Sequence, residues 1–327
     1  MFVVLTLVAS SAQICSAGAE SIGCGQTINQ SVKLDSDLNC MHSGTDGLKI
    51  GANNITLDCA GHTITGPASY YREATGLDGI SVTNASGITV KNCHVTYFDN
   101  GYVLSNSSND ILVRDKADNN GKYGFAVTSH SGNNRLDNDE AANDGGYGFA
   151  VAMDSIGNRI LDSLSSGNSE AGFVSLTRSN GTTFENDISY KNMQDGFILS
   201  SSSGGSLANN LAQENAYSGF ALFGSAGDNL GNNTSRANGM GGYLIVASSG
   251  NMLTGNEAER NGQDGFLADS GSADNSISAN ISDGNSGMGY EDSSLGGGTS
   301  STGNVYGSNT CQANLAGMSS PAGLCVG

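Results

Sequence analysis

The chain has 327 residues, of which 48 are glycine, 2 are proline and none is tryptophan. Its 31 acidic and 13 basic residues give a formal net charge of −18, and a field of this sign argues against nucleic acid and anionic membranes as partners. Anionic polysaccharides are repelled as well, unless a cation such as Ca²⁺ bridges the two surfaces. Disorder is disfavoured because 37% of the residues are hydrophobic and regularly spaced.

Residues 1–19 are predicted to be a secretory signal peptide. The stretch MFVVLTLVASSAQICSAGA is apolar but too short to span a bilayer, and Ala17, Gly18 and Ala19 supply a small-residue cleavage site, with Ala12 as an alternative. We therefore expect an extracellular or periplasmic protein without a membrane span.

The body of the chain, residues 20–310, carries a repeat of 22 to 24 residues. Each repeat has a glycine followed by an apolar or aromatic residue, and these glycines are Gly79, Gly101, Gly124, Gly148, Gly172, Gly196, Gly219, Gly242, Gly265 and Gly289. Short alternating stretches between them are separated by Gly, Asn, Asp and Ser, which is typical of strands and turns rather than of amphipathic helices. About three short strands in each period predict an all-β chain folded as a parallel β-helix of about 11 coils.

Two columns of this repeat have a predicted structural role. The aromatic residue after each glycine, such as Phe125 or Phe149, should point into the cylinder and stack at about 4.8 Å per coil. The Asn or Asp four residues before each glycine from Gly124 onward, such as Asn120, suits left-handed backbone angles and coil-to-coil hydrogen bonds.

The first coils resemble a known superfamily. The stretches CGQTINQSVKLDSDLNC (24–40), GLKIGANNITLDCAGHTITG (47–66) and GISVTNASGITVKNCHV (79–95) are similar to the start of right-handed parallel β-helix proteins of the NosD-like, pectate-lyase-like superfamily. The resemblance covers residues 24–310 and implies the right-handed fold. It implies no single function, since the superfamily includes lyases, hydrolases, epimerases and non-catalytic surface proteins. The Asp-Pro-His-Asp signature of alginate epimerases and the polygalacturonase motifs are absent from the sequence.

An insertion of about nine residues marks a candidate binding loop. It lies in GPASYYREATG, residues 66–76, and lengthened turns on such scaffolds often carry binding residues. Aromatic rings and polar groups there could contact a sugar, together with residues of the following coil. The predicted ligand-binding residues are Tyr70, Tyr71, Arg72, Glu73, His94, Tyr97 and Asp99. The alternative is a tolerated surface insertion.

Arg135 and Arg159 occupy the same offset in adjacent coils and should point outward about 4.8 Å apart. Two stacked guanidinium groups could contact or neutralise a sugar carboxylate, with nearby turn residues Tyr123, Tyr147 and His130 as further catalytic candidates. The favoured alternative is a set of exposed ion pairs with Asp137 and Asp162.

The stretch LDNDEAAND gathers enough carboxylates for a weak Ca²⁺ site, although it lacks the spacing of a calcium loop. Its candidate ligands are Asp137, Asp139, Glu140 and Asp144. No other cofactor is predicted.

Apolar residues also occur where the alternation of the strands predicts an outward face. The most prominent are Val174, Ile198, Leu244 and Leu267, which we call the apolar ribbon. A solvated strand face should carry polar side chains, so we expect the ribbon to be exposed on a single chain and covered by another subunit or by the C-terminal tail.

Six cysteines follow the predicted signal peptide, an even number that suits disulfides in an oxidising compartment. The two favoured pairs are local, one near each end of the chain: Cys24 with Cys40, and Cys311 with Cys325. Residues 311–327 are thus expected to form a disulfide-linked C-terminal cap, and the segment from Cys24 to Cys40 an N-terminal cap of the β-helix. Cys59 and Cys93 pair across neighbouring coils or remain buried thiols.

These observations predict a secreted β-helix protein that binds a polysaccharide or cell-surface glycan, or assembles at a surface, without a recognisable catalytic motif. A lyase or C5-epimerase acting on an acidic glycan is the first alternative, and an oligomeric surface or fibre protein is the second. Whether the chain is an enzyme stays open. Convergence of the arginine, tyrosine and histidine candidates in one groove would favour catalysis.

Overall fold

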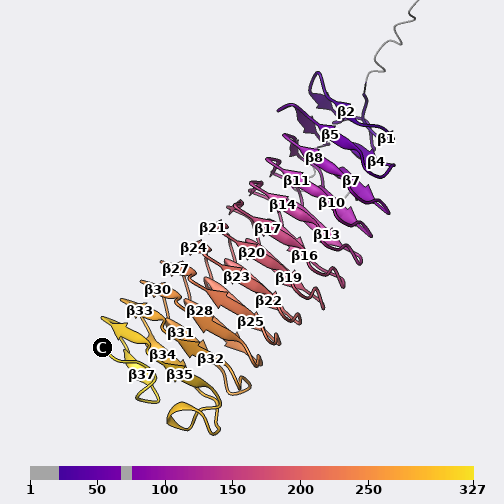
Figure 1. Cartoon of the computed structure of the whole chain (residues 1–327). Coiled ribbons are helices and arrows are strands. Elements are labelled where there is room, and N and C mark those ends of the chain that lie inside the picture. The colour runs from indigo at the N-terminus through magenta and orange to yellow at the C-terminus, as the bar shows by residue number, and fades with distance from the viewer. Residues whose placement is uncertain (1–21, 68–75) are drawn as a thin grey trace, which may run out of the picture.

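The computed structural model describes residues 22–67 and 76–327, which form a long stack of coils (Figure 1). Each coil gives one strand to each of three parallel sheets, named A, B and C. Sheet A contains β1 (Gln26–Ile28), β4 (Leu48–Ile50), β7 (Asp78–Thr83), β10 (Asn100–Ser105), β13 (Phe125–Thr128), β16 (Phe149–Val151), β19 (Phe173–Leu176), β22 (Phe197–Ser200), β25 (Phe220–Phe223), β28 (Tyr243–Val246), β31 (Phe266–Ala268), β34 (Met288–Asp292) and β37 (Gly317–Ser320).

Sheets B and C have one strand fewer each. Sheet B contains β2 (Val32–Lys33), β5 (Thr56–Asp58), β8 (Thr89–Lys91), β11 (Ile111–Val113), β14 (Arg135–Asp137), β17 (Arg159–Leu161), β20 (Thr183–Glu185), β23 (Ser206–Ala208), β26 (Asn229–Gly231), β29 (Met252–Thr254), β32 (Ser276–Ser278) and β35 (Val305–Gly307). Sheet C contains β3 (Leu38–Asn39), β6 (Thr63–Thr65), β9 (His94–Thr96), β12 (Lys116–Asp118), β15 (Glu140–Ala142), β18 (Leu164–Ser166), β21 (Ile188–Tyr190), β24 (Leu211–Gln213), β27 (Thr234–Arg236), β30 (Glu257–Glu259), β33 (Ile281–Asp283) and β36 (Thr310–Gln312). A 3-10 turn, η1 (Thr299–Ser301), precedes β35.

Each strand pairs with its counterparts in the neighbouring coils. Phe125 on β13, for example, lies opposite Tyr102 on one side and Phe149 on the other. All the pairings are parallel, and the chain visits the sheets in the order A, B, C in every coil. This arrangement confirms the predicted all-β, right-handed parallel β-helix.

The predicted aromatic column is confirmed. Nine rings, from Tyr102 to Tyr290, stack along sheet A with neighbouring centroids 4.5 to 4.9 Å apart and planes within 7°. All nine rings are buried. Offset stacking of buried rings stabilises the core by more than the area they remove from water.

The glycine before each ring is required because the next coil approaches closely. A Cβ atom at Gly148 would lie 2.1 Å from Oγ of Ser165 and 2.8 Å from the carbonyl oxygen of Gly172. At Gly124 the same atom would lie 2.7 Å from Cβ of Ala141. The 22 to 24 residue glycine period therefore records the contact between coils, which a larger residue would push apart.

Side chains at the three corners of each coil form hydrogen-bonded ladders. Ladder C, after sheet C, is the predicted column, which contains Asn120, Asp144, Asn168, Asn192, Asn215, Asn238, Asn261 and Asn285, and the structure extends it to Asn314. Its Asn168 Oδ1 accepts the backbone N–H of Asp144 at 2.9 Å, and its Nδ2 donates to Oδ1 of Asn192 at 2.9 Å. The left-handed backbone angle falls one residue earlier than the ladder, at Asn119 and Asn143.

Two further ladders were not predicted. Ladder A, after sheet A, contains Asp110, Asn134, Asn158, Asp228, Asn251, Asn275 and Asn304. Ladder B, after sheet B, contains Asp115, Asp139, Ser163, Asp187, Asn210, Asn233, Asn256, Asn280 and Asn309. Together the three ladders satisfy backbone donors that the turns would otherwise leave buried and unpaired.

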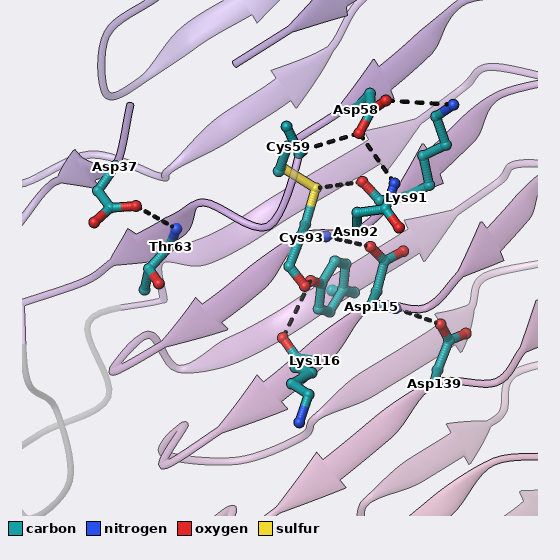
Figure 2. The surroundings of a disulfide bond; sticks show 12 residues. Asp37, Asp58, Cys59, Thr63, Lys91, Asn92, Cys93, Asp115, Lys116 and Asp139 are labelled. Atoms are coloured by element: carbon teal, nitrogen blue, oxygen red, sulfur yellow. Dashed lines mark hydrogen bonds and ion pairs between the residues drawn. A yellow bond between two sulfur atoms is a disulfide. The ribbon is translucent and has the colours of Figure 1, made fainter. Parts of the chain in front are cut away.

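Three disulfides join the six cysteines. The predicted pairs Cys24–Cys40 and Cys311–Cys325 are confirmed. The undecided pair is also bonded, with the Cα atoms of Cys59 and Cys93 4.7 Å apart. Figure 2 shows this bond between neighbouring coils, at the corner between sheets B and C.

The sheets continue into the predicted C-terminal cap. Strand β36 pairs with β33 and carries Cys311, and β37 pairs with β34. The predicted signal peptide, residues 1–19, lies outside the described residues. Within the described part of the chain, no helix has the length and hydropathy needed to cross a membrane.

Candidate functional site

Two tyrosines form a stacked pair on the outer side of sheet A. Tyr123 and Tyr147 directly precede the glycines of adjacent coils, and their ring centroids are 5.7 Å apart with planes within 3°. Both side chains are half-buried, and burial raises the pKa of each hydroxyl. The carboxylate of Glu170 lies near the Tyr147 hydroxyl and raises its pKa further. The pair thus keeps an aromatic surface in a fixed orientation at the protein surface.

A groove of about 380 Å³ lies over the N-terminal coils of the same face. Its lining includes Asp46, Lys49, Asp78, Ser81 and Thr83. Nζ of Lys49 lies 3.1 Å from Asp46, whose other carboxylate oxygen accepts the backbone N–H of Asp78 at 3.0 Å. The groove therefore offers carboxylate, ammonium and hydroxyl groups side by side.

The carboxylate of Asp78 is crowded by other negative groups. Burial raises its pKa first, and the carboxylates of Asp46 and Asp99 raise it further. Nδ2 of Asn100 donates to Asp78 at 2.8 Å, and this bond together with the charge of Lys122 acts in the opposite direction. A cationic or hydrogen-bond-donating ligand would relieve this crowding.

The tyrosines were predicted as site residues from the sequence, but the acidic part of the groove was not. A signal was present, because Asp46, Asp78, Asn100, Tyr123 and Tyr147 all directly precede the glycine of five successive coils. All five side chains are half-buried at the start of sheet A, so their residue types describe this part of the surface coil by coil.

The predicted ligand-binding residues are not brought together. Tyr70, Tyr71, Arg72 and Glu73 lie outside the described residues. His94 is on β9 in sheet C, where its ring contacts Asp118 and lies 3.3 Å from Oγ1 of Thr63. Tyr97 and Asp99 follow the sheet C strand. Tyr97 is exposed in the turn, while Asp99 is buried and its carboxylate accepts the backbone N–H of Gly76. Asp99 lies near Asp78 of the groove but is itself buried, whereas His94 belongs to another sheet.

The catalytic candidates lie on separate parts of the coil. Arg135 and Arg159 are neighbours in register on sheet B, as predicted. Arg135 pairs with Asp137 at 2.7 Å, and Arg159 pairs with Glu185 at 3.5 Å instead of with Asp162. The exposed His130 occupies the turn between sheets A and B. Along each coil, the tyrosines thus lie just before the sheet A strand and the histidine lies in the turn after it. The arginines lie on the following strand, in sheet B.

The calcium candidates also point to different places. Asp137 pairs with Arg135 on sheet B, and Glu140 contacts Lys116 on sheet C. Asp139 and Asp144 are buried rungs of ladders B and C. In residues 22–67 and 76–327, no group of three or more His, Cys, Asp or Glu side chains is arranged to hold a metal ion.

The apolar ribbon faces outward but is largely covered by its own neighbours. Val174 is 0% and Ile198 is 8% exposed, in a cluster with Ala150, Ala171 and Ala221 that is separate from the core. Tyr147, Leu176, Phe223 and Leu244 pack against this cluster. The expectation of a bare ribbon was wrong for Val174 and Ile198, because larger side chains flank the smaller ones, while Leu244 and Leu267 stay partly exposed.

Comparison with solved structures found similar folds. The A-module of mannuronan C-5 epimerase AlgE6 from Azotobacter vinelandii has 15% identity and a TM-score of 0.69, over 91% of this chain and 87% of that one. The periplasmic alginate epimerase AlgG has 15% identity and a TM-score of 0.64, over 90% and 76% of the two chains. The catalytic domain of a GH87 α-1,3-glucanase in complex with nigerose has 15% identity and a TM-score of 0.53, over 93% and 61%.

At such low identity, these likenesses concern the fold alone. A comparison with the sequences of curated proteins found no match. The family model for the right-handed β-helix region matches residues 32–189 and 174–322, which together span most of the sequence. The chain therefore belongs to the right-handed β-helix family.

Proposed function

We propose that this protein binds a carbohydrate polymer along the outer face of sheet A. The observation that carries the proposal is the stacked pair of Tyr123 and Tyr147, which follows the groove of Asp46 and Asp78 along the same column. Aromatic rings pack against the apolar faces of sugars, while carboxylates, amides and hydroxyls bond to sugar hydroxyls. The names of the similar structures, alginate epimerases and a glucanase, give independent support for a carbohydrate ligand.

The charges on this face favour a glycan that is uncharged or carries amino groups. Asp46 and Asp78 line the groove and Glu170 lies near Tyr147, with Lys49 in the groove and Lys122 near Asp78 as cations. Carboxylates accept hydrogen bonds from sugar hydroxyls and attract ammonium groups, but they repel uronates. A protein with a net charge of −18 adds to this repulsion at long range.

A secreted protein is part of the same proposal. The three disulfides fit folding in an oxidising compartment, and an extracellular or periplasmic location would bring the protein to polymeric glycans. The predicted signal peptide would provide the route.

A lyase or C5-epimerase is the second candidate, and the names of the similar structures favour it. Such an enzyme needs a group that neutralises the uronate carboxylate and a base that takes the C5 proton. Arg135 and Arg159 are paired with acidic residues on sheet B, away from the tyrosines. Binding without catalysis is therefore the better-supported function.

A self-associating surface protein is a third possibility, based on the apolar ribbon. Its covered part, at Val174 and Ile198, reduces the surface available to a second copy. Leu244 and Leu267 remain for such a contact, so light scattering on the secreted protein should accompany the binding tests.

Affinity electrophoresis would test carbohydrate binding. The wild type should be retarded by a neutral β-glucan or by chitosan more strongly than by alginate or pectate. The double variant Y123A/Y147A should lose this retardation, whereas Y190A, which removes a tyrosine from sheet C, should keep it. Unchanged retardation of Y123A/Y147A would contradict the site, and absence of binding to every polymer would contradict the function. Release of unsaturated uronate from alginate would support the lyase instead.

A further inference from the structure

Several rungs of the three ladders are aspartate where the others are asparagine. Four of these, Asp115, Asp144, Asp187 and Asp228, are almost fully buried. Within the described part of the chain, Oδ2 of each has no hydrogen-bond partner, although Oδ1 accepts a backbone N–H from the previous coil. A buried carboxylate oxygen without a partner is costly, so its repetition at four equivalent positions requires a physical reason.

An asparagine rung shows what the second polar atom of the side chain, Nδ2, does at this position. Oδ1 of Asn233 accepts the backbone N–H of Asn210 at 2.9 Å. Its Nδ2 donates to the carbonyl of Leu207 at 2.9 Å and to Oδ1 of Asn256 at 2.9 Å. Each rung thus combines one acceptor with one donor, and the donor ties it to both neighbouring coils.

The unpartnered oxygen of Asp144 occupies the place of such a donor. Measured from the position that a Cβ would take at Gly148, Nδ2 of Asn168 lies at 2.8 Å. From the equivalent position at Gly124, the nearest ladder atom is Oδ2 of Asp144 at 2.7 Å. Around Asp144 the environment is therefore built for a donor, and an ionised carboxylate has none to offer.

We propose that Asp115, Asp144, Asp187 and Asp228 carry a proton in the folded protein and act as asparagine equivalents, so that the stack of coils is most stable in acid and weakens as these protons are lost. A protonated carboxyl group has one O–H donor and one carbonyl acceptor, which is the hydrogen-bonding pattern of an asparagine side chain. The ladders then continue through every rung without a mismatch.

Around Asp115 the acidic neighbours act in the same direction as burial, whereas the guanidinium of Arg114 and the backbone N–H groups of Cys93 and Val113 act against it. Asp115 faces Asp58, the next rung Asp139 and, across the core, the hydroxyl of Tyr102, with Arg114 as the cation among them. Figure 2 shows Asp115 between the N–H of Cys93 and the rung Asp139.

The other three rungs face acidic groups or none. Asp118 lies near Asp144, and Asp162 and Glu185 lie near Asp187. For Asp228, burial is what opposes ionisation, against the hydrogen bond from the backbone of Gly205.

Burial raises the pKa of all four groups, to about 6 for Asp228 and about 8 for Asp115. A carboxyl group whose pKa is higher in the folded state adds stability that is fully present below its unfolded pKa of about 4. This stability is lost as the pH rises through the folded pKa, here between about 4 and 8. From Asp228 alone, the ratio of folded to unfolded protein should fall roughly fifty-fold over that range.

Urea denaturation of the full chain from pH 4 to pH 8 would test the proposal. The ratio of folded to unfolded wild type should fall across this range. In D228N this fall should be about fifty-fold smaller than in the wild type. The matched control D35N, at an exposed aspartate, should follow the wild type. Because asparagine already forms most rungs, D144N and D228N are expected to fold. At pH 6 the infrared difference between wild type and D144N should contain the carbonyl band of a protonated carboxylic acid.

Two results would overturn the proposal. One is a D228N variant whose stability has the same pH dependence as the wild type, which would mean that this rung does not gain a proton on folding. The other is the absence of a protonated carboxyl band at pH 6, which would mean that Asp144 is ionised and its oxygen unpartnered for another reason.

Discussion

Replacing one asparagine of ladder B with alanine should weaken the stack strongly at a single coil. Asn233 takes part in four side-chain hydrogen bonds: its Oδ1 accepts from the backbone N–H and Nδ2 of Asn210, and its Nδ2 donates to Leu207 and Asn256. The side chain is 1% exposed, so water cannot replace these partners in the folded state. N233A removes all four bonds and leaves the Leu207 carbonyl and the Asn210 donors without that partner.

The expected cost follows from the number of bonds. At about 1 kcal/mol for each hydrogen bond, the four bonds together contribute about 4 kcal/mol to the free energy of unfolding. The small cavity left by the amide group adds to this cost, while the lost burial of a polar side chain reduces it. We therefore expect N233A to lower the free energy of unfolding by about 3 to 5 kcal/mol.

Urea denaturation followed by far-UV circular dichroism would measure this change, and amide hydrogen exchange would locate it. Because each coil contacts its neighbours only, protection should fall most at the Asn210 amide and the adjacent coils. N29A, at an exposed asparagine of the first coil, should stay close to the wild type. An N233A variant within about 1 kcal/mol of the wild type would refute the reasoning, because the ladder would then contribute little net stability.

Three other substitutions test the packing between coils. F173A removes a fully buried ring from the middle of the aromatic column and should cost about 3 to 5 kcal/mol by chemical denaturation; an equally stable variant would show that the column is not tightly packed. G148A places a methyl group 2.1 Å from a side chain of the next coil and should lower the melting temperature, whereas G231A, with open space around the added atom, should not. C59S/C93S opens a loop spanning 34 residues and should cost about 3 to 4 kcal/mol; the reduced wild type should lose a similar amount, and no difference between reduced and oxidised protein would contradict a stabilising bond.

The fold could be predicted because its main constraints recur once per coil. The glycine at the close contact and the ring after it repeat with the same period, and the structure explains both by the approach of the next coil. Ladder B could have been found too, since Asn233, Asn256 and Asn280 keep the same spacing as Asn238, Asn261 and Asn285 of ladder C, five residues earlier. The predicted asparagine column lies at one corner of the coil, whereas the chain turns at three corners.

The site was predicted less well because outer side chains obey no packing rule. Tyr123 and Tyr147 were recognised, but as companions of Arg135 and Arg159, which the structure places on sheet B. The exposure of Val174 was misjudged, because alternation tells which way a side chain points but not what its neighbours cover. Groups from several coils, such as Asp46 and Asp78, meet only once the register between the coils is known.

The stacking of strands from coil to coil also determines how the molecule would respond to force. The backbone hydrogen bonds between neighbouring coils run along the stack, so tension applied to the two ends would open them one after another instead of shearing them together. Each coil of 24 residues would then release roughly 80 Å of extended chain, and the force trace would show a regular series of small steps. The disulfide between Cys59 and Cys93 would hold its two coils together throughout, so these N-terminal coils would resist extension while the coils after them open.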